Sequence, residues 1–447
     1  MPMPFEIPAI VQDRVSPRAR EYLKKIEHFV ETECIPADEV YEAQISKDPA
    51  LRWKTYPPVI DELKKKARAQ GLWNLFLSKT HYSEGAGFTN LEYGLMAEIL
   101  GRCHVASEAM NCSAPDTGNM EVLAKYGDAA QKKRWLEPLL DGRIRSAFLM
   151  TERFAASSDA RNINMRMRED GNDLVLNGTK WWSSGACDPR CAVYIVMCKS
   201  EKNTSSDPFR QQSVVLVPAG TPGVTVVRAL SVFGYDDAPH GHAEVRFENV
   251  RVPKSNLVLG EGRGFEIIQG RLGPGRIHHC MRSIGAAERA LDHMIARVND
   301  PARQTFGKPI SEHGTIRTWI AESRIAIDSC RLVVLNAADK IDRNDAKAAL
   351  KEIAMAKIVV PRTVCDILDK AIQAHGAGGV CQDFPLARTY AGLRTLRIAD
   401  GPDEVHLAQM GRNENSRAPE ITARLKQQEA RRDELFRLYK IEGRSQL

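Results

Sequence analysis

The change of residue pattern along the chain is the feature that most restricts its fold. Apolar residues recur at helical spacing up to about residue 147 and again from residue 264, whereas short runs rich in Val and Ile fill the stretch between. An order of helices, strands and helices, without βαβ alternation, predicts an α+β protein. The expected helices are residues 18–30, 59–69, 91–100 and 131–140 in the first part, and 316–341, 346–377 and 388–398 in the last.

The central stretch predicts a small antiparallel β-domain. Val245 and Phe247 alternate with Glu244 and Arg246, as residues of half-buried antiparallel strands do. The expected strands are residues 174–176, 192–198, 213–217, 224–227 and 243–252. We therefore expect three domains, which are an N-terminal helical domain (1–147), a central antiparallel, barrel-like β-domain (148–260) and a C-terminal helical bundle (261–447). The bundle would end in an exposed, charged helix from residue 420.

Composition excludes several classes of protein. The 447 residues are 43% hydrophobic and carry a net charge of +6, with basic and acidic residues interleaved, so we expect a globular protein and no nucleic-acid partner. No stretch approaches the roughly 20 apolar residues that span a bilayer, so we expect no membrane span. Cys187 and Cys191 lack a second pair of ligands at zinc spacing, so no metal site is expected.

The two ends of the chain bear on its location. The first residues have neither the basic start nor the apolar run of a signal peptide. The last three, Ser445, Gln446 and Leu447, differ by one residue from the Ser-Lys-Leu peroxisomal address. The tripeptide could be such an address or a tail that ends so by chance, which leaves a peroxisomal and a cytoplasmic location open.

A glycine-rich stretch imitates a dinucleotide-binding loop. Gly260, Gly262 and Gly264 follow a short apolar run, but Phe265 stands where the Rossmann fingerprint ends in glycine. A long helical pattern follows, with no parallel strand behind it. We interpret the stretch as a hinge between domains, which argues against a nicotinamide dehydrogenase.

Two other segments have residues suited to a planar ligand. Residues 146–159 are small and hydroxylated, which lets backbone and hydroxyl groups approach a polar ring, although a turn would explain them equally. In residues 177–185, Asn177-Gly178 predicts a hairpin turn. Trp181 and Trp182 would then point to opposite faces of a strand, one toward a ligand and one into the core, although a structural role for both would explain them as well.

Four segments together resemble the acyl-CoA dehydrogenase family, in family order. They are Met-Thr-Glu followed by Ser-Ser-Asp (150–159), Asn-Gly-Thr-Lys-Trp-Trp-Ser-Ser (177–184), Arg-Gln-Thr-Phe-Gly-Lys (303–308) and Gln-Ala-His-Gly-Ala-Gly-Gly (373–379). The resemblance covers about residues 90–412 and is closest to the branch with human members ten and eleven. It implies FAD as cofactor, acyl-CoA as substrate, an electron-transfer flavoprotein or oxygen as acceptor, and a homodimer or homotetramer.

The resemblance also implies which residues contact FAD. Phe148, Met150 and Thr151 would contact the flavin ring, and Trp182 would pack on it with Ser184 near its reactive nitrogen. Ser157 and Ser158 would lie along the flavin and the thioester. The remaining cofactor contacts implied, several of them to the FAD of a neighbouring subunit, come from Arg303, Thr305, Phe306, Gln373, Gly376, Ala377, Pro402 and Glu404.

Asp400 stands where the resemblance implies the catalytic base. It would take the α-proton while FAD takes the β-hydride, with Arg276, Gly401 and Ser158 contacting the acyl-CoA. A structural interpretation of the same residues is a helix start, in which Gly401 permits the turn and Pro402 is the first helical residue. The two interpretations are compatible.

The sequence departs from the family pattern at Arg153-Phe154, where a proline is usual. A bulky cation beside the flavin segment allows for an altered, polar acyl group. Pro115 and Asp116, where the family closes the acyl pocket, also argue against a plain long fatty chain. Two alternatives stay open: a flavin oxidase of the same fold that passes electrons to oxygen, and a non-catalytic FAD-binding protein.

Overall fold

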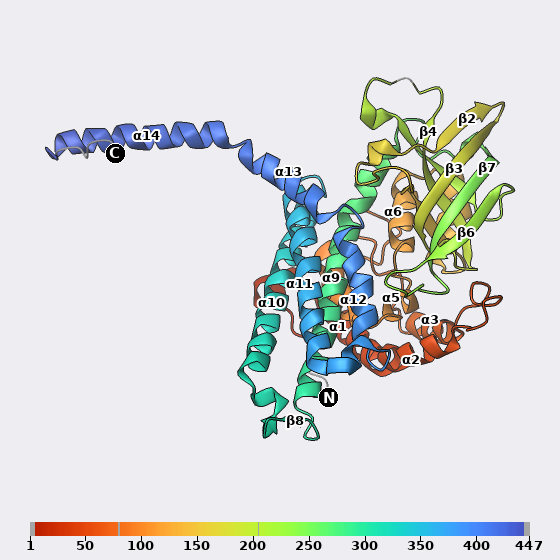
Figure 1. Cartoon of the computed structure of the whole chain (residues 1–447). Helices are drawn as coiled ribbons and strands as arrows, with labels where there is room; N and C mark the ends of the chain where they lie inside the picture. Colours follow the sequence, from red (N-terminus) through yellow and green to blue (C-terminus); the bar gives the residue numbers. More distant parts are fainter. Residues whose placement is uncertain (1–4, 79–80, 204, 442–447) are drawn as a thin grey trace.

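The computed structural model describes residues 5–78, 81–203 and 205–441. Long helices form one side of the molecule, a β-sheet lies beside them, and the last helix projects away from both (Figure 1). The polypeptide passes through N-terminal helices, the sheet and C-terminal helices in that order. The predicted α+β architecture is confirmed.

The N-terminal part is helical, as its apolar periodicity predicts. The predicted helices at 18–30, 59–69 and 91–100 correspond to α1, α3 and α4, and the one at 131–140 contains an inserted π-helical segment, Lys132–Leu136. The α-helices are α1 (Pro17–Phe29), α2 (Ile35–Gln44), α3 (Val59–Ala69), α4 (Asn90–Gly101), α5 (Ala106–Ala109), α6 (Asp116–Tyr126), α7 (Ala129–Gln131) and α8 (Glu137–Leu140).

Seven strands form the central sheet, in the order β1-β4-β2-β3-β7-β6 with β5 paired to β4. They are β1 (Arg145–Leu149), β2 (Arg166–Asp170), β3 (Asp173–Ser184), β4 (Cys191–Ser200), β5 (Gln212–Pro218), β6 (Val224–Leu230) and β7 (His242–Pro253). The five predicted strands are present. The polar residues of β1 and β2 conceal their strand pattern, so these two strands were not predicted.

The sheet differs from the prediction in two ways. It is mostly antiparallel, but β1 runs parallel to β4 and the start of β2 also pairs with β4 in parallel. The predicted hairpin turn at Asn177-Gly178 is wrong, because both residues lie inside β3, where the register opposite β7 shifts. Gly178 has φ +149°, and a Cβ there would lie 2.8 Å from the Cγ of Met165. Glycine is therefore needed here because the chain packs closely at a bulge, and not because the chain reverses direction.

The C-terminal part contains the longest helices. They are α9 (Gly264–Val298), α10 (Gly314–Arg343), α11 (Leu350–His375), α12 (Leu386–Arg394), α13 (Asp403–Asn415) and α14 (Ala418–Leu438), with the short strands β8 (Gln304–Thr305) and β9 (Lys308–Pro309) between α9 and α10. Because α9 starts directly at Gly264 and leads into this hairpin, the glycine-rich stretch is no Rossmann loop, as predicted.

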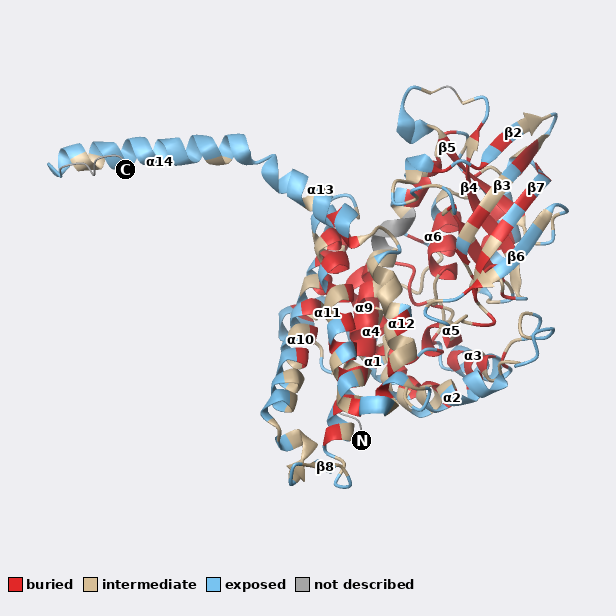
Figure 2. Ribbon diagram, viewed as in Figure 1, coloured by how far each residue is buried: buried red, intermediate tan, exposed pale blue. Residues whose placement is uncertain are grey.

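The main core lies between the N-terminal and C-terminal helices. Buried apolar residues of α1, α4, α9, α10 and α11 form one cluster, and the sheet has a second cluster of its own (Figure 2). Almost every residue of α4 is buried, including the polar Asn90, Glu92 and Glu98. By contrast, α14 has no buried residue, which confirms the predicted exposed tail helix. Within the described part of the chain, no helix has the length and apolarity to cross a membrane.

Candidate active site

Asp400 lies in a tight loop between the 3-10 helix Thr395–Arg397 and α13. Its backbone is in the left-handed region, with φ +56°, and Gly401 follows with φ +100°. A Cβ at Gly401 would lie 2.7 Å from Nε2 of His406, so only glycine fits there. The helix α13 starts at Asp403 with Pro402 as its N-cap, one residue later than predicted. The loop thus presents Asp400 outside the start of the helix, as the sequence suggested.

Three buried or half-buried side chains hold this loop. Nε of Arg276 donates to the backbone oxygen of Asp400 at 3.1 Å, and Nε2 of His406 lies 3.3 Å from the same oxygen. Lys357, which is buried, donates to the backbone oxygen of Leu396. Burial, with the nearby charges of Arg276 and Lys357, lowers the pKa of His406 to about 4, so its imidazole is neutral at pH 7.

The helix α9, which contains Arg276, also places a histidine beside the Asp400 carboxylate. Nε2 of His279 lies 3.7 Å from Oδ2 of Asp400, and Nη2 of Arg282 lies 3.2 Å from Nδ1 of the same histidine. His279 follows Arg276 by three residues on α9, so both side chains face the Asp400 loop. The i, i+3 spacing in Gly-Pro-Gly-Arg-Ile-His-His was the signal, but sequence reasoning assigned only Arg276.

On the sheet side, a buried ion pair fixes the segment that follows β1. Nζ of Lys180 donates to Glu152 at 2.8 Å and to the backbone oxygen of Met150 at 2.9 Å. Glu152 also accepts from the backbone N–H groups of Asn164 and Met165. The Lys180 side chain is 0% exposed, and burial lowers its pKa. This pair therefore joins the predicted flavin segment to β3, a role that sequence reasoning missed.

The predicted flavin residues on the sheet lie close together. The backbone N–H of Trp181 donates to Thr151 at 3.0 Å, which places Thr151 beside the two tryptophans. Trp182 has φ +51° and is 39% exposed, whereas Trp181 is half-buried and its Nε1 has no hydrogen-bond partner among the described residues. The register shift of β3 between Lys180 and Ser183 produces this arrangement. An exposed indole and an orphaned indole N–H suit a flat polar ligand.

The two serines after this segment have different surroundings. The Ser157 hydroxyl accepts from the backbone N–H of Glu152 at 3.1 Å and donates to Ala155. Ser158 is exposed. Arg153 and Phe154 are also exposed, with the guanidinium 5.3 Å from the ring centre, so both lie on the surface of this loop.

Ser184 ends β3 opposite His242, the first residue of β7. Its Oγ lies 2.8 Å from Nδ1 of His242, and Nε2 of His242 lies 3.3 Å from Oδ2 of Asp237. Sequence reasoning assigned no role to His242, whereas the structure places it in a strand and makes it a cross-strand partner of Ser184.

Helix α9 connects the sheet side of the site to Asp400. Ile268 of α9 is buried in a small cluster against which Phe148 and Met150 pack. Arg276, which contacts Asp400, lies eight residues further along, or about 12 Å at 1.5 Å per residue. The flavin segment and Asp400 therefore flank the same two turns of α9.

The remaining predicted cofactor residues lie at the other end of the bundle. Arg303 and Thr305 lie in or beside the β8–β9 hairpin, and Phe306 there is 96% exposed. Gln373, Gly376 and Ala377 are exposed at the end of α11, next to the end of α9, since Arg297 donates to the oxygen of His375 at 3.1 Å. From Arg276 to the end of α9 at Val298 is about 33 Å of helix. The chain thus forms two separate groups of predicted cofactor residues.

Pro402 and Glu404, two further predicted cofactor residues, lie at the start of α13. Pro402 caps α13, and Glu404 is exposed in its first turn. Asp116 does not face an open pocket, because its carboxylate binds Arg145 at 2.9 Å and both the N–H and the hydroxyl of Ser146. Sequence reasoning missed this buried ion pair of Asp116.

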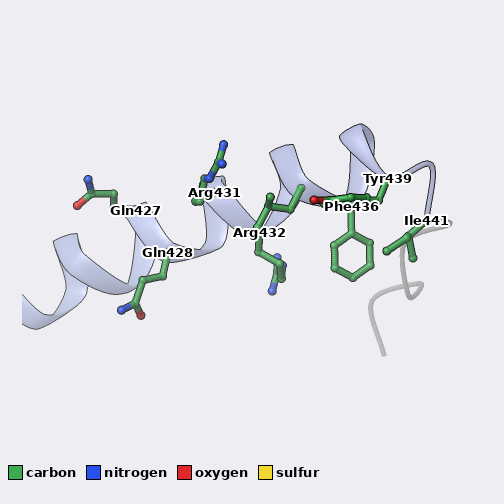
Figure 3. A pocket seen from close by; sticks show the side chains of 8 residues that line it. Gln427, Gln428, Arg431, Arg432, Phe436, Tyr439 and Ile441 are labelled. Carbon is green, nitrogen blue, oxygen red and sulfur yellow. The ribbon is translucent and has the colours of Figure 1, made fainter.

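A surface hollow also lies away from these residues. It runs along α14, where its lining includes Arg432, Phe436 and Tyr439 (Figure 3). None of the predicted site residues lies in α14, and the chemistry described above is at α9 and the Asp400 loop. We therefore assign no catalytic role to this groove. In the described ranges, no group of three or more His, Cys, Asp or Glu side chains is arranged to hold a metal ion.

Three family models match almost the whole chain in order. Residues 16–143 match the N-terminal domain of acyl-CoA dehydrogenases, residues 147–250 their middle domain, and residues 262–414 their C-terminal domain. A solved structure assigned to an acyl-CoA dehydrogenase from Mycobacterium abscessus has a TM-score of 0.86 and 45% identity, and covers 90% of this chain and 99% of that one.

Curated relatives give the same result. Acyl-CoA dehydrogenase family member 11 of Gallus gallus is 52% identical over 89% of this chain and 50% of that protein. FadE2 of Mycobacterium tuberculosis, named a probable acyl-CoA dehydrogenase, is 51% identical over 90% of this chain and 97% of that protein. The chain thus spans about half the length of member 11 and nearly all of FadE2.

Proposed function

Because the chain belongs to the acyl-CoA dehydrogenase family, we propose that it binds FAD and removes two hydrogens from an acyl-CoA thioester. The observation that carries this proposal is the Asp400 loop. It presents a carboxylate beside Arg276 of α9, and Ile268, two turns earlier on the same helix, packs against the predicted flavin segment. The base and the redox cofactor would then lie beside the same two turns of α9.

The residues on the sheet suit FAD. The exposed Trp182 ring offers a flat surface, and the buried N–H of Trp181 needs an acceptor. Phe148, Met150 and Thr151 lie beside them, and Ser184 ends the same strand. One solved structure of the same fold is a complex with FAD. We propose that these side chains hold the ring system, with Ser157 and Ser158 along its edge toward the thioester.

When bound, FAD would supply the acceptor for the β-hydrogen and its electron pair. Asp400 would break the α C–H bond of the thioester by taking the proton, so that a Cα=Cβ double bond forms. General-base positioning of this kind contributes roughly 10² to 10⁴ in rate. The backbone N–H of Asp400 would stabilise negative charge on the thioester oxygen.

Arg276 supports this step from α9. Its Nε donates to the backbone oxygen of Asp400 at 3.1 Å, so it fixes the loop that contains the base. Burial lowers the pKa of its guanidinium, although the charge of Asp400 opposes that shift. We propose that Arg276 also lies against the bound acyl-CoA, with Gly401 allowing the substrate to approach the backbone.

The second group of cofactor residues supports a homo-oligomer. Arg303, Thr305, Phe306, Gln373, Gly376 and Ala377 lie at the far end of the bundle, about 33 Å along α9 from Arg276. The Phe306 ring is 96% exposed, so its apolar face is accessible to a partner. We propose that these residues bind the diphosphate and adenosine of FAD held by a second copy of the chain.

Anaerobic titration of the FAD-loaded protein with a panel of acyl-CoA thioesters tests the proposal. Loss of flavin absorbance with one thioester, and formation of its enoyl product, is expected. Readmitting air then distinguishes acceptors, because stoichiometric hydrogen peroxide would indicate an oxidase. The panel should include acyl groups with a distal polar group, since exposed Arg153 lies beside the flavin segment. Absence of bleaching with every thioester would contradict the proposal.

A further inference from the structure

Ser184, His242 and Asp237 form a continuous chain of hydrogen-bonding groups. Oγ of Ser184 lies 2.8 Å from Nδ1 of His242, and Nε2 of His242 lies 3.3 Å from Oδ2 of Asp237. The serine and the histidine are direct cross-strand partners in β3 and β7. Their relative position is therefore set by the sheet and not by a loop.

The carboxylate determines where the imidazole proton lies. Burial acts to raise the pKa of Asp237, but the hydrogen bond from His242 contributes to lowering it overall, so the group is ionised at pH 7. An ionised carboxylate only accepts hydrogen bonds. In the neutral imidazole the proton therefore lies on Nε2, facing Asp237, and Nδ1 is left as an acceptor for the Ser184 hydroxyl.

The surroundings support a fixed imidazole. The His242 ring lies 5.5 Å from the exposed Trp182 ring, and the His240 ring lies 6.4 Å away. Burial, with the charge of Arg145, lowers the pKa of His240 to about 3, so it adds no positive charge at pH 7. On its other side, Asp237 has the guanidinium of Arg388 at 3.7 Å.

We propose that Asp237 and His242 are positioning residues that turn the Ser184 proton away from FAD, so that Ser184 offers its oxygen to the flavin as an acceptor. This inference rests on the proposed function, in which Ser184 lies near the reactive ring nitrogen. That nitrogen accepts a hydrogen bond in oxidised flavin and carries an N–H in reduced flavin. An oriented acceptor at Ser184 would therefore favour the reduced cofactor.

The test is the ratio of reduced to oxidised FAD in the loaded protein, equilibrated with a reference dye at fixed potential. In His242→Phe the Ser184 proton loses its acceptor and is free to donate to oxidised flavin. One hydrogen bond predicts about a tenfold fall in the ratio, or about 30 mV for a two-electron couple. Asp237→Asn keeps the histidine ring and should lower the ratio by a smaller factor. If His242→Phe loses FAD, Asp237→Asn is the variant that tests the inference.

A double-mutant comparison isolates the serine. In a Ser184→Ala background, His242→Phe should leave the ratio unchanged, because no hydroxyl remains to be oriented. Asp236→Asn is the matched control, since Asp236 lies beside Asp237 but binds Arg52 at 2.6 Å. The ratio of reduced to oxidised FAD in this variant should equal that in the wild type.

The outcomes separate the two proposals. An unchanged ratio in both His242→Phe and Asp237→Asn, or an equal effect of His242→Phe with and without Ser184, would overturn the inference while FAD binding and bleaching persist. A wild-type chain that binds no FAD, or binds it and is not reduced by any acyl-CoA, would instead overturn the proposed function.

Discussion

Nε2 of His279 lies 3.7 Å from Oδ2 of Asp400, and the guanidinium of Arg282 lies 3.2 Å from Nδ1 of the same histidine. A guanidinium has only donors, so Nδ1 must accept from it. The neutral imidazole therefore carries its proton on Nε2, directed at the Asp400 carboxylate. His279 is thus a donor that orients the proposed base from the same helix face as Arg276.

His279→Ala should slow flavin reduction about tenfold at saturating substrate, with a smaller change in KM. The reason is that the variant loses the imidazole that lies 3.7 Å from the carboxylate used in the proton-transfer step. His279→Gln keeps a donor at similar reach and should recover part of the rate. Stopped-flow reduction under anaerobic conditions measures both variants. Equal rates in His279→Ala and the wild type would exclude a positioning role.

Gly401→Ala should destabilise the protein by about 1–3 kcal/mol and slow flavin reduction. The added Cβ would lie 2.7 Å from Nε2 of His406, at φ +100°. Gly411→Ala is a matched control on α13, because a Cβ there meets nothing within 4 Å and alanine favours the helix. Denaturant unfolding gives both free energies. Equal effects in the two variants would show that the loop does not need its left-handed glycine.

Lys180→Met should destabilise the protein by about 3–5 kcal/mol and release FAD more readily, because Glu152 is left buried without its cation. Adding Glu152→Gln should recover part of that loss, since the buried charge is then removed. Asp433→Asn, in an ion pair on exposed α14, should leave stability unchanged. Thermal unfolding, monitored by flavin fluorescence, measures the stability of all three variants. No recovery in the double variant would mean that the buried charge is not the cause.

The stability of the protein should depend on His406 between pH 7 and pH 5. Its pKa is about 4 in the folded protein, below the ordinary value of 6.5, so the unfolded chain binds more protons in this range. Stability therefore falls as pH falls below about 6.5, by about 2 kcal/mol at pH 5. Urea unfolding of His406→Gln should show a weaker pH dependence than the wild type. Equal dependences in the two proteins would contradict a neutral, buried His406.

Much of this fold could be predicted from residue periodicity. The helices α3 and α4 and the strand β5 have apolar patterns that burial alone explains, so their predicted bounds agree with the structure to within one residue. The strand β1 was not predicted because Arg145 and Ser146 are polar. Both are buried with partners on other elements, such as Asp116, and those long-range partners cannot be read from local pattern.

The site was predicted unevenly for the same reason. Asp400 and Trp182 lie in local motifs, and the structure places each where a ligand can reach it. Lys180, His242 and His279 were overlooked, because each acts through a partner on another element. The Asn177-Gly178 pair shows the converse error, since a local turn signal was overridden by the pairing of β3 with β7.

The most direct test of the proposed function compares Asp400→Asn with the wild type in anaerobic titration with the thioester that bleaches the wild-type flavin. Asparagine has nearly the same shape but cannot take a proton. The variant should bind FAD with an unchanged oxidised spectrum and bind the thioester, yet lose its flavin absorbance at least 100-fold more slowly. Bleaching of Asp400→Asn at the wild-type rate would contradict the assignment of Asp400 as the catalytic base.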